Sequence, residues 1–192
     1  LLIDATASGG WLPINVQAAN ISLLSLAPHR FSGPQGVGIL YRNRRVPLTP
    51  LLHGGVQEDG LRAGTENIPA IIGAGAAALL SLPDVAPLQR KLHEGLMERL
   101  ELIHLNGPKP GAGRLPSQLN YSIEYLEGEG LALALDLQGV AIASGAACVT
   151  QNLAVPPALL AIGLDSALAK GNVLLSLGRD STPDDIAHVL DI

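Results

Sequence analysis

One candidate for chemistry in this sequence is a single cysteine. Cys148 is the only cysteine in the chain, so it cannot form an internal disulfide or, alone, a structural zinc site. It ends the run Ala143-Ser144-Gly145-Ala146-Ala147-Cys148, whose small residues favour a flexible loop. A lone cysteine is ordinarily a buried hydrophobic residue, whereas an accessible thiolate would act as a nucleophile or sulfur acceptor. Reactivity of the thiol would separate the two roles.

Three further candidates follow short apolar runs. Asp4 follows residues 1–3, and His29 and Arg30 follow residues 21–26. Arg30 carries a guanidinium that stays protonated and that pairs with phosphate or carboxylate in bidentate fashion. Cys148 together with His29 or Asp4 could contribute metal ligands, but no spacing signature supports a metal site.

Composition excludes several partner classes. The net charge is −5, whereas nucleic-acid binding calls for a basic patch. Hydrophobic residues make up 47% and charged residues 15%, against about 25% charged in average chains. No apolar run reaches the roughly 20 residues that span a bilayer, and nothing resembles a signal peptide, so we expect a cytosolic protein. The scarcity of polar residues predicts a face that is covered by a partner or by further sequence.

The elements that must position these residues alternate between strands and helices. Apolar runs predict short strands buried on both faces, and 3.6-residue periodicity predicts helices. Thr65 or Asn67 is expected to cap the helix that follows, and Thr182 and Pro183 open the last helix. The expected strands are residues 1–3, 21–26, 36–41, 119–123, 140–143 and 172–177, and the expected helices are 67–82, 88–103, 129–137, 155–162 and 183–192. This order indicates an α/β fold, with a boundary between Pro83 and Pro87.

Four stretches are distinctive when taken together. They are Asp4-Ala5-Thr6, the runs 28–36 (PHRFSGPQG) and 53–65 (HGGVQEDGLRAGT), and the run that ends at Cys148. In this order and spacing the chain resembles the C-terminal half of the cysteine desulfurases, which are fold-type-I pyridoxal-phosphate (PLP) enzymes of aminotransferase class V. The resemblance extends from the first residue to the last. It implies that residues 1–86 are the C-terminal part of the large PLP-binding domain and that 87–192 are the small α/β domain.

The resemblance also implies an activity. In that family a lysine holds PLP as a Schiff base, and a mobile loop cysteine takes sulfur from the substrate cysteine as a persulfide. The persulfide is passed to an iron–sulfur scaffold or another sulfur acceptor. PLP supplies the electron sink, and the protein orients it. The partners implied are therefore a second subunit and a sulfur acceptor protein.

Four residues match functional positions of the family. Asp4 matches the aspartate that keeps the ring nitrogen protonated, and His29 matches the histidine that touches the cofactor. Thr65 matches a threonine that reaches the phosphate in the neighbouring subunit, which implies a homodimer. Cys148 matches the persulfide-carrying cysteine. Without the resemblance, Asp4 and His29 would be ordinary loop residues and Thr65 a helix cap.

The departures from the family pattern are concentrated in the same pocket. Arg30 stands at the lysine position and offers no free amine for a Schiff base. Ala7 replaces a glutamine that contacts the ring hydroxyl, Ala27 replaces a serine that binds phosphate, and Leu174 replaces an arginine that clamps the substrate carboxylate. These changes predict a desulfurase-like protein that is inactive or impaired.

Three readings of the function follow. The first is a non-catalytic scaffold or accessory subunit, the second a desulfurase that retains activity through noncovalent PLP or another amine, and the third a sulfur carrier through Cys148 without PLP. Family members also have a large N-terminal segment that nothing in this chain replaces. A separate polypeptide or further sequence would have to supply it, because its loss exposes sheet edges.

Overall fold

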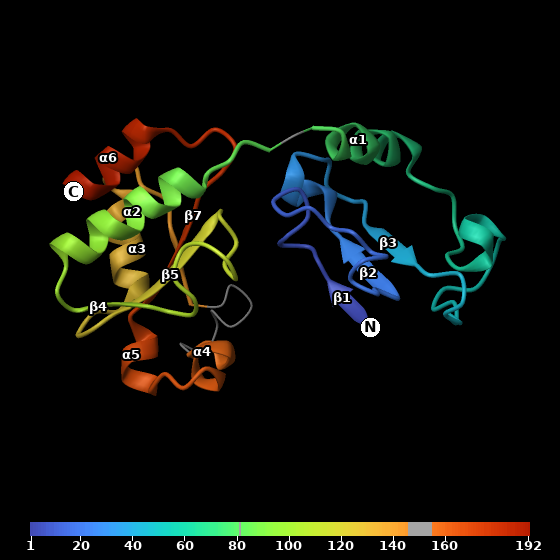
Figure 1. The fold of residues 1–192 in the computed structure, drawn as a ribbon. Coiled ribbons are helices and arrows are strands. Elements are labelled where there is room, and N and C mark those ends of the chain that lie inside the picture. Colours follow the sequence, from blue (N-terminus) through green and yellow to red (C-terminus); the bar gives the residue numbers. More distant parts are fainter. Residues whose placement is uncertain (81, 146–154) are drawn as a thin grey trace. The chain divides into compact units, whose positions relative to one another are not determined.

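The computed structural model describes residues 1–80, 82–145 and 155–192. The chain forms two compact units, Leu1–Leu82 and Pro83–Ile192, each with its own sheet (Figure 1). Each unit is considered by itself below. Strands and helices are mixed in both, as the alternating pattern predicts for an α/β fold. The assignment of the two parts to named domains of the family stays a prediction.

The first unit contains a three-stranded sheet in the order β1-β2-β3. Strand β1 (Leu2–Asp4) is parallel to β2 (Leu23–Leu26), and β2 is antiparallel to β3 (Ile39–Arg42). The core cluster of buried and partly buried side chains comprises Ala5, Ile21, Leu24, Ile3, Val16, Leu26 and Tyr41. The core of the first unit therefore lies around β2.

The outer strands of this sheet are less buried than the sequence predicts. Leu2 of β1 is 66% exposed and Leu40 of β3 is 51% exposed. Apolar strands in parallel sheets normally have both faces covered. Within the described part of the chain the prediction of covered faces is therefore wrong for β1 and β3, since Leu2 and Leu40 remain exposed.

One longer helix packs near this sheet. Helix α1 (Ile68–Ala78) begins after Asn67, whose side chain accepts a 3.2 Å hydrogen bond from the N–H of Ala70. Asn67 rather than Thr65 is thus the cap, and the helix ends four residues before the predicted residue 82. Its buried residues are all alanines, which permits close approach to the 3₁₀ helix η1 (Pro28–Phe31). A second 3₁₀ helix, η2 (Gln57–Gly60), lies in the preceding loop.

The second unit is built on a four-stranded antiparallel sheet, in the order β4-β5-β7-β6. Its strands are β4 (Ile103–Leu105), β5 (Gln118–Ile123), β6 (Ala143–Ser144) and β7 (Asn172–Ser176). Alternate residues of β5 face opposite sides of the sheet. One side carries Leu119 and Tyr121, which are 1% and 0% exposed. The other carries Asn120 and Ser122.

On the polar side of this sheet, side-chain amides form a hydrogen-bond network. The side-chain N–H groups of Asn106 and Asn172 both donate to Oδ1 of Asn120, each over 2.7 Å, and Asn106 also donates to Oγ of Ser122. Asn106, Ser122 and Asn172 are buried. Burial of these groups is tolerated because each finds a hydrogen-bond partner.

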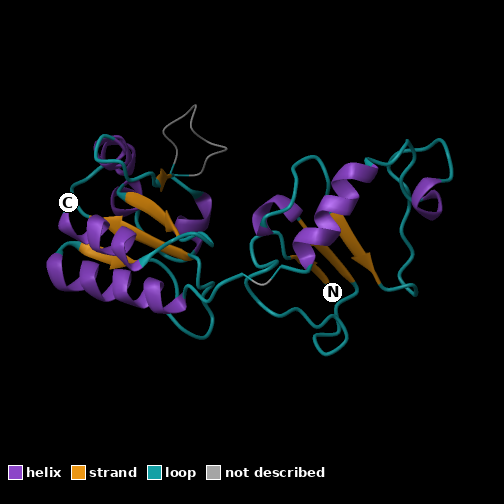
Figure 2. Ribbon diagram, turned by 90° about the horizontal axis from the view of Figure 1, so that it is seen from above, coloured by secondary structure: helices purple, strands orange, loops and turns teal. Residues whose placement is uncertain are grey.

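Helices cover the apolar side of the sheet (Figure 2). Side chains of α2 (Ala86–Arg99), α3 (Gly128–Asp136) and α6 (Pro183–Asp191) line one cavity together with Tyr121 and Val173, so they share that side. The short helices of the unit are α4 (Pro157–Ala161) and α5 (Ser166–Lys170). Helix α6 opens with the predicted cap, a reciprocal box between Thr182 and Asp185.

Two predicted boundaries in this unit are wrong. The helix predicted for residues 88–103 ends at Arg99, because Leu100 adopts extended angles (φ −119°, ψ 123°) and Ile103 pairs with Ile123 in β4. The strand predicted for 140–143 starts only at Ala143. Gly139 there takes a φ of 81°, which turns the chain out of α3.

Candidate functional site

Asp4 lies at the carboxyl end of β1 with its side chain fixed. Its Oδ1 atom accepts hydrogen bonds of 3.0 Å from the backbone N–H of Thr6 and from the hydroxyl of Ser25. The backbone N–H of Thr6, followed by the Thr6 side chain and the Ser25 hydroxyl, lowers the pKa of Asp4 below its ordinary value of 3.8. The result is an exposed carboxylate that stays ionised and has one oriented oxygen.

The turn that carries His29 and Arg30 lies at the same end of the sheet. Asp4 is directly opposite Ser25 in the parallel pair β1–β2, and η1 begins three residues after Ser25. Carboxyl ends of parallel strands are where α/β folds place their ligand sites. The structure therefore brings the predicted residues Asp4, His29 and Arg30 to one end of one sheet.

Local backbone geometry presents Arg30 outward. The N–H of Arg30 donates to the carbonyl of Ala27 over 3.0 Å, and the N–H of Gly33 donates to the carbonyl of Pro28 over 2.8 Å. A Cβ at Gly33 would contact that same Pro28 carbonyl, so glycine is required there. His29 and Arg30 are both exposed. Among the described residues the Arg30 guanidinium forms no hydrogen bond or ion pair, and it remains available to an anion.

The run 53–65 forms the loop before α1. Oε1 of Gln57 accepts a 3.2 Å hydrogen bond from the N–H of Gly64, which closes the loop on itself. Glu58 and Asp59 adopt left-handed angles, with φ of 50° and 56°, a conformation that costs energy for residues other than glycine. Thr65 follows the loop and is exposed. No hydrogen bond within the described part of the chain joins Thr65 to Asp4 or His29.

The remaining predicted positions are spread over the chain. Ala7 and Ala27 belong to the first unit. Leu174 is in β7 of the second unit, opposite Asn120 and Ala143. Cys148 lies outside the described residues.

Sequence reasoning missed the two residues that hold Asp4. Thr6 had a local signal, because an aspartate that accepts from the N–H two residues later forms an Asx turn. Ser25 is 21 residues away, and it becomes a partner only through the parallel register of β1 and β2. No local pattern contains that register.

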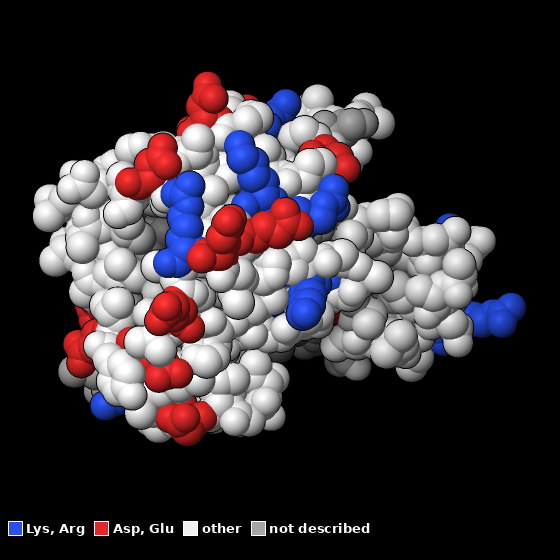
Figure 3. Space-filling view, turned by 60° about the vertical axis from the view of Figure 1, so that its left-hand side comes forward, with Lys and Arg blue, Asp and Glu red and all other residues white. Residues whose placement is uncertain are grey.

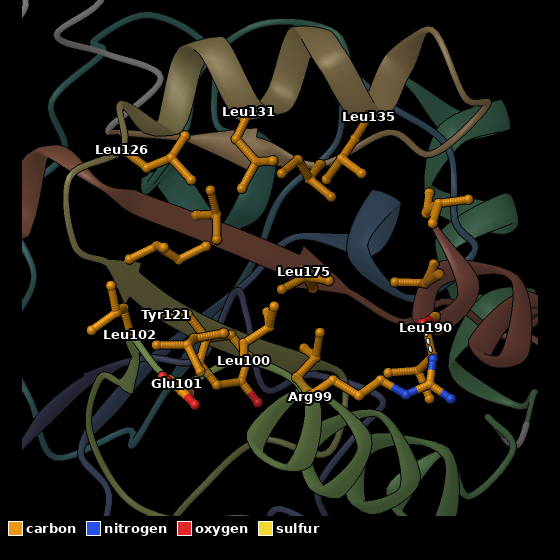
Figure 4. Close-up of a pocket in the computed structure, with 17 residues that line it drawn as sticks. Arg99, Leu100, Glu101, Leu102, Tyr121, Leu126, Leu131, Leu135, Leu175 and Leu190 are labelled. Carbon is orange, nitrogen blue, oxygen red and sulfur yellow. Dashed lines mark hydrogen bonds between the residues drawn. The ribbon is translucent and has the colours of Figure 1, made fainter.

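A cavity of about 530 Å³ lies within the second unit (Figure 4). Its walls are mostly aliphatic, with Leu96, Leu131 and Leu135 among them, and none of the predicted site residues lines it. Arg99 at its margin donates to the carbonyl of Leu190 and pairs with Asp191 at 3.4 Å. The lining is mostly packing surface, and its ionisable members are Arg99, Glu101 and Tyr121.

The described residues contain neither a cluster suited to a metal ion nor a membrane-spanning helix. Within residues 1–80, 82–145 and 155–192, no three His, Cys, Asp or Glu side chains gather in a way that could hold a metal ion. None of the helices in that part of the chain combines the length and apolar character that a membrane crossing needs. On the face shown in Figure 3, acidic and basic side chains are interspersed, and no extended basic surface is visible.

Comparison with known sequences gives a consistent result. The model of the family described as Aminotransferase class-V matches residues 1–189. The cysteine desulfurase IscS of Dictyoglomus turgidum is 38% identical over 196 residues, which cover 98% of this chain and 49% of that protein. The corresponding protein of Methanosarcina thermophila is 42% identical over 195 residues, with 98% and 48% covered. This chain spans about half the length of the curated relatives it matches.

Solved structures agree with the sequence comparison. A NifS-like protein superimposes with a TM-score of 0.85 at 31% identity, covering 99% of this chain and 50% of its own. A NifS-like protein from Rickettsia africae gives a TM-score of 0.87 at 25% identity, with 99% and 51% covered. The α/β prediction and its assignment to the fold-type-I architecture are confirmed. The chain belongs to the aminotransferase class-V family, and the relatives compared above are named cysteine desulfurases or NifS-like proteins.

Proposed function

We propose that this chain is a cysteine desulfurase relative that does not form a lysine-bound PLP and that serves as a non-catalytic scaffold or accessory subunit. The observation that carries the proposal is Arg30 in η1, at the position that the resemblance assigns to the family's lysine. A guanidinium remains protonated at all physiological pH values and cannot condense with an aldehyde.

The residues of the first unit fit PLP only in part. Asp4 offers an ionised carboxylate of the kind that pairs with a protonated ring nitrogen. The first unit has no lysine at all, because Lys91, Lys109 and Lys170 all belong to the second. The site therefore does not fit PLP in its Schiff-base form, and this proposal assigns no catalytic step to the cofactor.

Three further departures support loss of turnover. Ala7 and Ala27 lack the polar groups that the family uses on the ring hydroxyl and the phosphate. Leu174 cannot replace an arginine on the substrate carboxylate, because an aliphatic side chain offers no charge-assisted hydrogen bond. The loss of several polar contacts to cofactor and substrate favours a change of role.

The partners belong to the same proposal. The match of Thr65 to the family's threonine that reaches the neighbouring subunit implies a homodimer. Because the chain matches only about half the length of its relatives, the rest of the family fold would be supplied on this polypeptide or another. An iron–sulfur scaffold or other sulfur acceptor and a cytosolic location follow from the family. Sulfur carriage by Cys148 stays a prediction.

The test is covalent trapping of PLP. The protein is incubated with PLP, its visible absorbance is recorded, and borohydride reduction is followed by intact mass and peptide mapping. We expect no site-specific adduct on the wild-type chain. A reduced adduct on one lysine of the wild-type chain would show that another amine has replaced residue 30 and would contradict the proposal.

A matched pair of variants sharpens this test. Arg30→Lys restores an amine at the family position and is expected to give an adduct at residue 30. Arg44→Lys adds a lysine on an exposed loop of the same unit and is expected to give none. A difference between the two variants would attribute the lost Schiff base to residue 30 itself.

A further inference from the structure

Arg114 in the second unit is a half-buried cation with no acidic partner in the described part of the chain. Its Nε donates to the carbonyl of Pro108 and its Nη2 to the carbonyl of Asn106. Its Nη1 donates to the carbonyl of Gln118 over 3.4 Å. Three of the five guanidinium N–H groups are thus used, and two remain. Burial lowers the pKa of Arg114. Because a partly buried charge without a counter-charge is costly to the fold, a bound anion would offset that cost.

The loop between β4 and β5 brings a second cation to this guanidinium. Gly111 and Gly113 in the loop take φ of 123° and 95°, angles that favour glycine. The loop turns back on itself there, so that Arg114 binds the carbonyl of Pro108, the residue before Lys109. The side chain of Lys109 is exposed and forms no ion pair with the described residues.

His93 of α2 supplies a third donor. Its Nδ1 lies 2.8 Å from the hydroxyl of Tyr121, and the two rings stack with centroids 6.1 Å apart. Among the described residues that nitrogen is the partner of the buried hydroxyl, so the hydroxyl donates to Nδ1 and the imidazole proton resides on Nε2. Burial, followed by the positive charge of Arg114, lowers the pKa of His93, and Lys109 acts in the same direction. Both cations therefore lie near the ring, and the opposing charge is that of Glu94, the next residue in α2.

We infer that His93, Lys109 and Arg114 form a binding site for a compact oxyanion of the phosphate class. A guanidinium with unused N–H groups, an ammonium and an imidazole N–H together match the several acceptor oxygens of such an anion. Free phosphate and the phosphoryl group of a larger molecule both offer this chemistry. The site lies within the second unit and uses neither residue 30 nor PLP. It goes beyond the proposed function, and either can fail without the other.

Titration of the full chain with inorganic phosphate tests the site. Heteronuclear NMR follows the imidazole of His93 while phosphate replaces chloride at constant ionic strength and neutral pH, with no PLP present. We expect a saturable shift of the His93 signals. We also expect a higher pKa of His93 in phosphate than in chloride, because a nearby anion favours the protonated imidazole. Signals that do not respond, or that drift without saturating, would overturn the inference.

Lysine variants separate a specific site from general screening. Lys109→Gln removes one exposed charge and should weaken phosphate binding by roughly two- to fivefold, the range for one exposed charge pair. Lys91→Gln is the matched control, because Lys91 is exposed on α2 two residues before His93, and positions i and i+2 of a helix do not face each other. Its affinity for phosphate should equal that of wild type. Equal weakening in the two variants would show that only net charge matters and would also overturn the inference. Arg114→Gln removes three loop hydrogen bonds as well, so Lys109→Gln is the decisive variant.

A second ligand distinguishes the two sources of the anion. Glycerol phosphate carries the same phosphoryl group on an uncharged organic part. Tighter binding of glycerol phosphate than of inorganic phosphate, with the same dependence on Lys109, would assign the site to a phosphorylated molecule. Equal or weaker binding of glycerol phosphate would assign it to the free ion.

Discussion

Ser25 and Asp4 are joined by a 3.0 Å hydrogen bond from the serine hydroxyl to Oδ1 of the aspartate, across the parallel pair β1–β2. The N–H of Thr6 donates to the same oxygen. The carboxylate at the end of β1 is therefore held by one local and one distant donor. This relationship ties the electrostatics of the candidate site to the register of the sheet.

Replacing Ser25, the distant donor, should weaken the effect that lowers the pKa of Asp4. Ser25→Ala is expected to raise the pKa of Asp4 only part of the way to its ordinary value of 3.8, because the Thr6 contributions remain. A carboxyl whose folded pKa is lowered stabilises the fold above pH 3.8 and loses that contribution as the pH falls through the folded value. NMR titration of the Asp4 carboxyl measures the shift. Ser8→Ala, which removes a hydroxyl bonded to Ala5 instead, should leave it unchanged.

The cap of α1 gives a prediction about stability. Asn67→Ala removes the acceptor for the N–H of Ala70, and loss of such a cap costs about 1 kcal/mol. Thr65→Ala is the control, since Thr65 does not cap the helix. Denaturant unfolding of the two variants measures the difference. Equal losses would contradict the assignment of the cap to Asn67.

The environment of His93 predicts that the stability of the second unit depends on pH. Its Nδ1 lies 2.8 Å from the hydroxyl of buried Tyr121, whose pKa burial raises to about 12. Burial, followed by the positive charge of Arg114, lowers the pKa of His93 below 6.5. The unfolded chain then binds the proton more tightly, so stability should fall as the pH drops below about 6.5.

Variants at two histidines isolate this contribution. The free energy of unfolding is measured between pH 8 and pH 5 for wild type, His93→Gln and His53→Gln. We expect a weaker pH dependence in His93→Gln. His53 is exposed in a loop, and its variant should follow wild type. An unchanged slope in His93→Gln would assign the dependence to other groups.

Two glycines of the second unit should respond in opposite directions to alanine. A Cβ at Gly171 would overlap the carbonyl of Ile123, which is backbone and cannot move aside cheaply. Gly130 is inside α3, with nothing within 4 Å of its added Cβ. Gly171→Ala should therefore destabilise the fold, whereas Gly130→Ala should stabilise it by up to about 1 kcal/mol. Thermal unfolding of both variants checks the signs.

Much of the fold was predictable because its signals are local. The apolar runs around Leu24 and Leu119 lie in strands, and the cap at Thr182 opens α6 as predicted. The end of the helix predicted for residues 88–103 was missed because a distant partner decided it. The helical periodicity continues past Arg99, but Ile103 pairs with Ile123 in the antiparallel pair β4–β5.

The sequence by itself determined the family pattern, the position of Arg30 and the lack of a lysine in residues 1–82, since these depend only on residue identity and order. The tertiary structure decided which residues meet. It brought Ser25 within hydrogen-bond distance of Asp4 and placed η1 at the same end of the sheet. These relationships depend on strand register over 20 or more residues, and no local spacing encodes them.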